Sequence, residues 1–129
     1  MTKARELRFV FVTENYEAAA HLYRDVFGLE VLLDLDEQDG RGVILKVPTA
    51  TLELVDPHHE AMVDEVEVGR RVGEPFRIAV RVDDVEEAGR AVAETGAEAR
   101  AGPVETPWGD YNLRFRAKDG LQLTLFQSP

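Results

Sequence analysis

Few residues of this chain belong to the types that perform covalent catalysis. There is no cysteine, which excludes disulfides, thiolate chemistry and Cys-based zinc sites. The sole serine is Ser128, and no GxSxG, HExxH or Gly-rich phosphate-binding motif is present. The chemistry left open is therefore binding by charged and aromatic side chains, or metal coordination by His, Asp and Glu.

Two segments invite a metal-binding interpretation. The pair His58–His59 consists of adjacent residues, which point in different directions on a helix and chelate poorly together, so we expect solvated linker residues unless a partner chain adds ligands. The acidic segment Asp34–Gly42 resembles a calcium loop. However, Asp39 stands where such a loop needs Gly, and Leu45 where it needs Glu. An acidic hairpin loop with a turn at Gly40 is the better interpretation.

Charged residues recur at equivalent places in two similar stretches. Residues 8–33 and 77–102 both read as strand, turn, helix, turn and strand. One constant offset aligns Arg8, Glu17 and Ala19 with Arg77, Glu86 and Ala88. Each unit also closes on a similar strand, TLELV around Glu53 and QLTLF around Thr124. The pattern predicts an internal duplication, and two units of this size predict one domain built from two like halves.

In each stretch an N-cap residue opens the helix and a glycine closes it. Asn15 and Asp84 hold the N-cap positions, and Glu87 completes a capping-box pattern after Asp84. Gly28 and Gly96 are placed to end the two helices, because glycine adopts the left-handed conformation without a Cβ penalty.

The remaining residues predict short strands and one connecting helix. The further strands are expected at residues 43–47, 50–55, 97–100, 111–116 and 121–127. Pro57 suits the start of a helix in the connector, and the turn-rich loop 101–110 carries Trp108. The predicted organisation is a first module at about residues 5–55, a linker at 56–75 and a second module at about 76–127.

Length and charge limit the function classes. A chain of 129 residues is typical of a single domain with a proper core. Its 25 acidic and 15 basic residues give a net charge of -10, which disfavours nucleic acid and anionic membranes as partners. No apolar run suits a signal core or a membrane span. We therefore expect a cytoplasmic protein without a nucleic-acid or membrane partner.

The ordered set of motifs resembles the vicinal oxygen chelate superfamily, which includes glyoxalase I, bleomycin-resistance proteins and extradiol dioxygenases. The resemblance is carried by LYRDVFGLEV at 22–31, TLELV around Glu53, RIAVRVDDVEEA at 77–88 and residues 106–127. It implies an α+β fold in which two βαβββ modules form a curved mixed sheet around a cavity, with the helices outside. It also implies a homodimer, and it leaves open whether the modules pair within one chain or between chains.

Family enzymes hold a metal ion with ligands on the first and last strand of each module. The resemblance places these four positions at Arg8, Glu53, Arg77 and Thr124. Only Glu53 is a typical ligand, because arginine stays protonated and has no lone pair to offer. We therefore expect no metal and no other cofactor, and the loss of three ligands favours a non-catalytic protein, unless the ligand mapping is wrong.

A charged pair could replace the metal. Our hypothesis is that Glu53 pairs with Arg8 and Arg77, either as a structural ion pair, which we favour, or with a guanidinium edge left to bind an anionic or carbonyl-bearing ligand. Strand alternation places Gln122, Thr124 and Phe126 on the cavity side. The other candidates for the cavity wall are Trp108, Tyr111, Arg114, Arg116 and Phe126.

The sequence leaves three candidate functions. The first is a metal-free, homodimeric small-molecule-binding protein similar to the bleomycin-resistance branch, which would sequester an antibiotic or another bulky, partly planar metabolite. The second is a metal-dependent lyase, isomerase or dioxygenase of the glyoxalase or extradiol type. The third is a subunit or regulator whose cavity is filled. The missing ligands favour the first.

Overall fold

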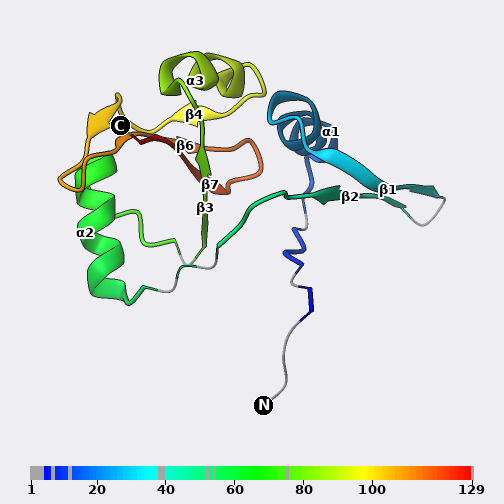
Figure 1. Cartoon of the computed structure of the whole chain (residues 1–129), viewed down its shortest axis with the longest axis horizontal. Helices are drawn as coiled ribbons and strands as arrows, with labels where there is room; N and C mark the ends of the chain where they lie inside the picture. Colours follow the sequence, from blue (N-terminus) through cyan, green and yellow to red (C-terminus); the bar gives the residue numbers. More distant parts are fainter. Residues whose placement is uncertain are drawn as a thin grey trace.

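The computed structural model describes residues 5–6, 8–11, 13–37, 40–51, 53, 55–74 and 76–128 (Figure 1). It has the predicted α+β fold, with helices and two separate sheets. The elements, in chain order, are α1 (Tyr16–Ala20), η1 (His21–Val26), β1 (Glu30–Glu37), β2 (Gly40–Lys46), α2 (Pro57–Val68), β3 (Arg77–Arg81), α3 (Val85–Ala93), β4 (Glu98–Ala99), β5 (Val104–Glu105), β6 (Tyr111–Arg116) and β7 (Gln122–Gln127).

The larger sheet is formed by the second half of the chain. Its strand order is β3-β7-β6-β4, and β5 pairs with β6. β3 runs parallel to β7, with Arg77 opposite Gln122, while β6 and β7 form an antiparallel hairpin in which Arg114 lies opposite Thr124. These strands agree with those predicted from the sequence, and β5 is an additional short strand within the predicted loop 101–110.

The hydrophobic core lies between this sheet and the helices. The buried members come from β6, β7, α3 and η1, and they include Leu113, Phe115, Leu123, Leu125, Val85, Val92 and Leu22. Ile78 and Val80 of β3 pack against this cluster. The apolar residues of β3, β6 and β7 therefore face α3 and η1, and strand alternation leaves the intervening residues on the opposite side.

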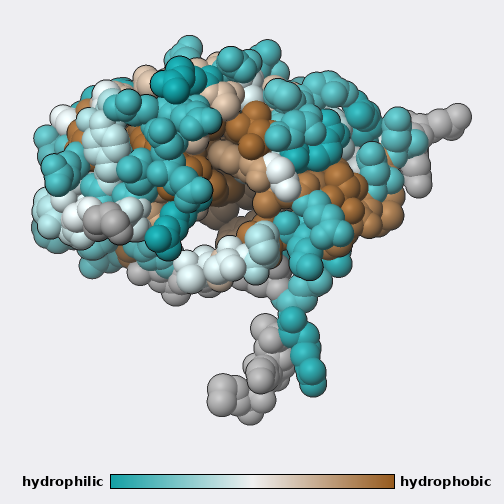
Figure 2. Space-filling model, turned by 45° about the horizontal axis from the view of Figure 1, so that its top comes forward, coloured by the Kyte–Doolittle hydropathy of each residue, from teal (hydrophilic) through white to brown (hydrophobic). Residues whose placement is uncertain are grey.

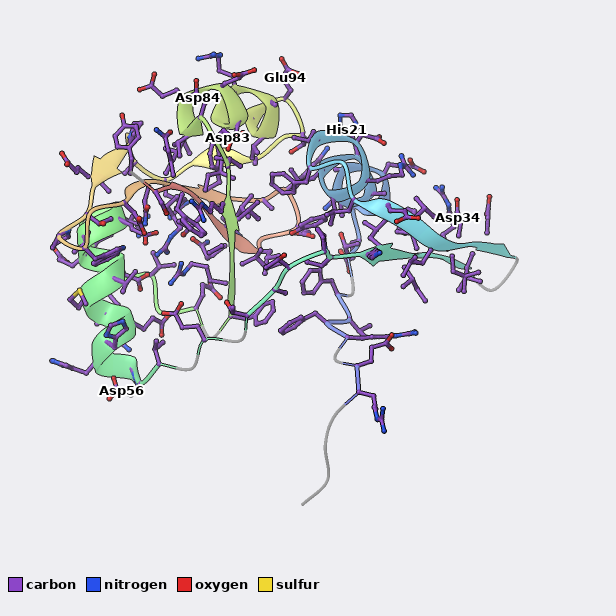
Figure 3. The ribbon with its side chains drawn as sticks, viewed as in Figure 1. His21, Asp34, Asp56, Asp83, Asp84 and Glu94 are labelled. Carbon is purple, nitrogen blue, oxygen red and sulfur yellow. The ribbon has the colours of Figure 1, made fainter. Side chains whose placement is uncertain are left out.

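α3 begins as the sequence predicts. The side chain of Asp84 accepts hydrogen bonds from the backbone N–H groups of Glu86 and Glu87, at 3.0 and 3.1 Å. Gly96 has a φ of 94°, the left-handed conformation expected after a helix. Figure 3 labels Asp84 where it enters α3, next to Asp83.

Replacing Asp84 by Ala removes this cap. We expect the free energy of unfolding to fall by about 1 kcal/mol, because two N–H groups of the first turn lose their acceptor. Urea unfolding of the Asp84→Ala variant measures the change. Asp83→Ala is the matched control, since Asp83 is an exposed neighbour that is not the capping residue. Equal losses in both variants would contradict the capping role.

The first helix differs from its prediction at its start. Asn15 makes no side-chain capping bond, and its φ of -111° and ψ of 59° lie outside the extended region typical of an N-cap. Its own N–H donates to Thr13 Oγ1 instead. The helix then continues as a π-helix, in which the N–H of Phe27 donates to Leu22 O, and Gly28 follows with a φ of 69°, as predicted.

The first half of the chain forms a two-stranded hairpin that projects away from the larger sheet (Figure 1). β1 and β2 pair antiparallel, and a bulge interrupts the register between Val31 and Leu33. The predicted strands at 8–12 and 50–55 include residues outside the described ones, and their described residues are not in strands. Within the described part of the chain, therefore, the two halves are not alike.

The connecting helix is confirmed. α2 starts at Pro57, and the Asp56 side chain accepts a hydrogen bond from the N–H of His59 (Figure 3 labels Asp56 at this end). His58 and His59 are exposed, as expected of linker residues. Among the described residues, none of the helices combines the length and hydropathy that crossing a membrane would require.

Candidate functional site: a buried two-arginine cluster

The side of the larger sheet that faces away from α3 carries polar residues. Arg77 comes from β3, Asn112 and Arg114 from β6, and Gln122 and Thr124 from β7. They share one face because side chains alternate along each strand and the strand register aligns them. Helix α2 covers this face, and it contributes two buried carboxylates.

Arg114 is the centre of the cluster. Its side chain is 1% exposed. Nη1 lies 3.0 Å from Asp64 Oδ1, and Nε lies 3.0 Å from Glu67 Oε1, so a single guanidinium group joins two carboxylates of α2. A buried charge requires partners of this kind, because an isolated ion in the protein interior loses its hydration without compensation.

Thr124 links the two arginines to Glu67. Its hydroxyl accepts hydrogen bonds from Arg77 Nη1 at 3.1 Å and from Arg114 Nε at 3.2 Å. The same hydroxyl donates to Glu67 Oε1 at 2.8 Å. Two guanidinium groups and two carboxylates thus meet on one face of the sheet, and their formal charges cancel.

The remaining contacts fix the carboxylates. Glu67 Oε2 accepts from Asn112 Nδ2 at 3.2 Å. Asp64 Oδ2 accepts from the backbone N–H groups of Val72 and Gly73, at 3.0 and 3.2 Å, in the segment that follows α2. The cluster therefore connects α2, the chain after it and strands β6 and β7.

The pKa of Asp64 follows from these contacts. Burial by itself would raise it, but the N–H groups of Gly73 and Val72 and the Arg114 guanidinium together outweigh burial, so the pKa lies below its ordinary value of 3.8. A carboxylate with a lowered pKa stabilises the folded state above its unfolded pKa, and this stabilisation is lost as the pH falls through the folded value.

Asp64→Asn tests this dependence. At pH 7 we expect the variant to be less stable by about 1.5–3 kcal/mol, because a charged, buried acceptor is replaced by a neutral one. The difference should begin to shrink as the pH falls below 3.8 and should disappear below the lowered pKa of the folded state, where the wild-type carboxylate also becomes neutral. Urea unfolding at a series of pH values measures it. A difference that stays constant down to the acid transition would contradict the assignment.

Several polar atoms in the cluster lack a partner. Arg114 Nη2, Asn112 Oδ1 and Gln122 Oε1 are buried and have no hydrogen-bond partner within the described part of the chain. The first can donate and the other two can accept. Buried polar atoms are rarely left unpaired, so this face has spare capacity for a water molecule or for a polar group of a ligand.

Three of the predicted site residues are brought together, namely Arg77, Arg114 and Thr124. The hypothesised pairing of Glu53 with Arg8 and Arg77 is not formed. Arg8 Nε lies 2.6 Å from Glu6 Oε2, and Glu53 is exposed. Arg77 Nη1 donates to the Thr124 hydroxyl instead, and the carboxylates of α2 pair with Arg114.

The predicted aromatic wall is only partly formed. Tyr111 lies on the opposite side of the sheet from Thr124, where it packs against the core and its hydroxyl donates to Glu86 Oε1 at 3.1 Å. Its role as a ligand contact stays a prediction. Trp108 is 46% exposed in the loop after β5. Phe126 lies on the polar face opposite Asn112 and is half-buried, while Arg116 is exposed.

The two acidic residues of α2 were missed by the sequence prediction. Asp64 and Glu67 are three residues apart, a spacing that places both on one helix face. They contact the buried Arg114, whereas most acidic residues of a linker helix would be solvated. The available signal was this i, i+3 pair in the helix that the sequence predicts for the connector.

The cluster does not suit the metal ion that the resemblance implies. Guanidinium groups have no lone pair to donate, and Thr124 Oγ1 is already engaged by Arg77, Arg114 and Glu67. Among the described residues, no three His, Asp or Glu side chains converge on one point. The prediction that the protein works without a metal nevertheless stays a prediction.

An exposed aromatic group lies near the junction of the two halves. The ring centroids of Phe9 and Phe11 lie 5.6 and 5.7 Å from that of Phe76, and these side chains are 50%, 39% and 39% exposed. Tyr23 extends the group, at 6.2 Å from Phe11. Figure 2 shows a hollow in the middle of the molecule, with hydrophobic surface along its upper and right-hand edges and hydrophilic surface on its left.

A second, polar cleft of about 460 Å³ lies between the segment before α1 and the turn that joins β6 and β7. It is lined by Thr13, Glu14, Asn15, Arg116, Lys118, Asp119 and Gly120. Its charges are of both signs and are largely exposed, so it indicates no particular ligand.

Comparison with known proteins identifies a family to which this chain is similar. A sequence model of the Glyoxalase/Bleomycin resistance protein/Dioxygenase superfamily matches residues 7–125. No curated protein matches the chain significantly.

Solved structures with the same fold include three that are informative. A member of the superfamily from Sphaerobacter thermophilus DSM 20745 is 23% identical, with a TM-score of 0.54 and 92% of each chain covered. A lactoylglutathione lyase from Agrobacterium tumefaciens is 25% identical, with a TM-score of 0.52 and coverage of 89% of this chain and 87% of its own. TnmS3, an antibiotic binding protein from Streptomyces sp. CB03234, is 24% identical, with a TM-score of 0.54 and coverage of 96% and 100%.

Proposed function

Because the chain belongs to the Glyoxalase/Bleomycin resistance protein/Dioxygenase superfamily, we propose that it is a small-molecule-binding protein that works without a metal ion. The observation that carries this proposal is the convergence of Arg77 and Arg114 on Thr124. At two of the positions where a family enzyme would hold its metal, this chain has one hydroxyl and one guanidinium group.

The exposed aromatic side chains support a planar or partly planar ligand. Phe9, Phe11 and Phe76 present ring faces and edges that can stack on an aromatic or conjugated molecule. The fold is shared with an antibiotic binding protein, which is compatible with such a ligand, although that likeness supports the fold and not the identity of the ligand.

We also propose a homodimer. The hairpin carries exposed apolar residues along β1, namely Val31 at 40%, Leu32 at 58%, Leu33 at 48% and Leu35 at 40%. A two-stranded hairpin is at best marginally stable in water, and apolar patches of this kind usually mark an interface. A second copy of the chain is the occupant that the family resemblance implies.

The experiment for the binding proposal is a calorimetric titration of EDTA-treated protein with a panel of aromatic antibiotics. We expect at least one compound to bind with the metal removed. Phe76→Ala should weaken that binding, because the ring lies between Phe9 and Phe11. Phe27→Ala is the control for general aromatic loss, since Phe27 packs against the core. Binding that appears only after metal is restored would contradict the proposal.

The second candidate is a metal-dependent lyase, isomerase or dioxygenase. One observation favours it, namely the 25% identity to a lactoylglutathione lyase over 89% of this chain. Conversion of the hemithioacetal of methylglyoxal and glutathione by metal-supplemented protein would support this candidate over the first.

A further inference from the structure

Helix α2 is attached to the sheet mainly by charged groups. Of its side chains, Val63, Asp64 and Glu67 are buried, and only the first is apolar. No residue of α2 belongs to the main core cluster. A helix of 12 residues has little stability of its own and normally depends on an apolar face, so the position of α2 depends largely on its two carboxylates.

These carboxylates occupy the donors that an organic anion would use. Glu67 receives hydrogen bonds from Arg114, Thr124 and Asn112, while Asp64 receives one from Arg114. The side chains that donate these hydrogen bonds lie on strands of the larger sheet, whereas the carboxylates that accept them lie on the connecting helix α2. Within the described part of the chain, Arg114 Nη2, Asn112 Oδ1 and Gln122 Oε1 lie on the same face and have no partner. The face therefore offers more hydrogen-bond donors and acceptors than the side chains of α2 occupy.

We propose that α2 is a displaceable cap over a carboxylate-binding site. In the free protein Asp64 and Glu67 neutralise Arg114 and Arg77, and a small organic molecule that bears two carboxylate groups takes their place when α2 moves off the sheet. This inference rests on the proposed function, because it names the ligand class of that binding protein. It assigns the polar face of the larger sheet as the place where the charged end of the ligand binds.

Charge balance favours an anion with two carboxylates. Removal of α2 alone would leave two guanidinium groups facing each other, which is costly, and a neutral ligand would not compensate for this. A dicarboxylate restores neutrality. Each of its planar carboxylates also matches the geometry of a guanidinium group, which can donate two parallel hydrogen bonds. The spare acceptors, Asn112 Oδ1 and Gln122 Oε1, suit a hydroxyl or amine group on the same molecule.

The absence of native cysteine permits a direct test. In the full chain, Val63→Cys introduces the only thiol, on the buried side of α2, and its reaction rate with a thiol reagent reports how often the helix leaves the sheet. The probes are succinate and citrate, with succinamide and sodium chloride of matched ionic strength as neutral and salt controls. Val92→Cys, in the core, is the matched variant that reports global unfolding.

We expect succinate or citrate, at about ten times its dissociation constant, to accelerate labelling at Val63→Cys about tenfold, because the anion binds only the open form. Labelling at Val92→Cys should not accelerate. Glu67→Gln should raise the apparent affinity, since it weakens the cap. Arg77→Met should abolish the acceleration, and as Arg77 is only half-buried this variant keeps the Arg114 contacts to α2.

Two results would overturn the inference. The first is calorimetric binding of the carboxylates with unchanged or slower labelling at Val63→Cys. The second is no binding of either carboxylate to the wild type or to Glu67→Gln. If aromatic antibiotics still bind the EDTA-treated protein in that second case, the proposed function stands and only the cap and the ligand class fail.

Discussion

Replacing Arg114 by Met is expected to lower the free energy of unfolding by about 3–5 kcal/mol, which is a large part of the stability of a small domain. The side chain is 1% exposed, and it is the cation that Asp64 and Glu67 share. Without it, two carboxylates remain buried beside a single half-buried arginine, Arg77. Urea unfolding at pH 7 measures the loss.

The control lies two residues along the same strand. Arg116 is exposed, so Arg116→Met should change stability by no more than about 0.5 kcal/mol. A triple variant, Arg114→Met with Asp64→Leu and Glu67→Leu, should recover part of the loss, because it removes the unpaired buried charges. The recovery is incomplete because the N–H groups of Val72 and Gly73 lose their acceptor. Equal stability of Arg114→Met and Arg116→Met would contradict a buried, mutually dependent cluster.

The second large effect concerns assembly. We expect the wild type to have twice the 14.4 kDa chain mass in solution, and Leu33→Glu combined with Leu35→Glu to convert it to the single-chain mass. The two leucines are two residues apart on β1 and so share one face of the hairpin. Burying two carboxylates in an apolar interface without partners would cost more than most dimers gain. Light scattering after size-exclusion chromatography measures the mass.

Met62→Glu is the control for the dimer prediction. Met62 is 41% exposed and apolar but lies on α2, away from the hairpin, so this variant should stay dimeric. A wild type that is monomeric across the micromolar range would contradict the proposed assembly. A dimer that Met62→Glu disrupts and the β1 variant does not would place the interface on α2 instead.

The second half of the fold follows closely from local sequence signals. Asp84 caps α3 as predicted, and Gly96 follows that helix with a positive φ. β6 spans the predicted residues 111–116, because apolar and polar residues alternate there with the period of two that a strand requires. Both faces of this strand are buried, the apolar one against the core and the polar one beneath α2. Such signals depend on neighbouring residues only, so they can be read without tertiary information.

The candidate site could be predicted only in part. Strand alternation puts Thr124 and Arg77 on the same face, but it does not say which distant element covers that face. The ligand positions implied by the family resemblance suggested Glu53 as the carboxylate partner of Arg8 and Arg77, whereas the structure places Asp64 and Glu67 of the connecting helix beside Arg114. Tertiary packing determines which element covers the face, and the alternation of residues along a strand does not predict it.

The first half shows the limit of the repeat. Asn15 matches Asp84 in position but makes no capping bond, because its backbone is not extended. The strands expected on either side of the hairpin do not appear in the described residues at 8–11 and 50–51. Strand formation needs a neighbouring strand as well as a suitable sequence, and within the described ranges β1 and β2 pair with each other and with no further strand.

The measurement that tests the central claim most directly is the metal content of the protein, by elemental mass spectrometry. The chain would be purified without a His-tag or chelator and measured again after incubation with Zn, Ni, Mn and Fe(II). We predict no tightly held ion, since Arg77 and Arg114 occupy the surroundings of Thr124. About one ion per chain would contradict the proposal of a metal-free binding protein and would favour the metal-dependent enzyme instead.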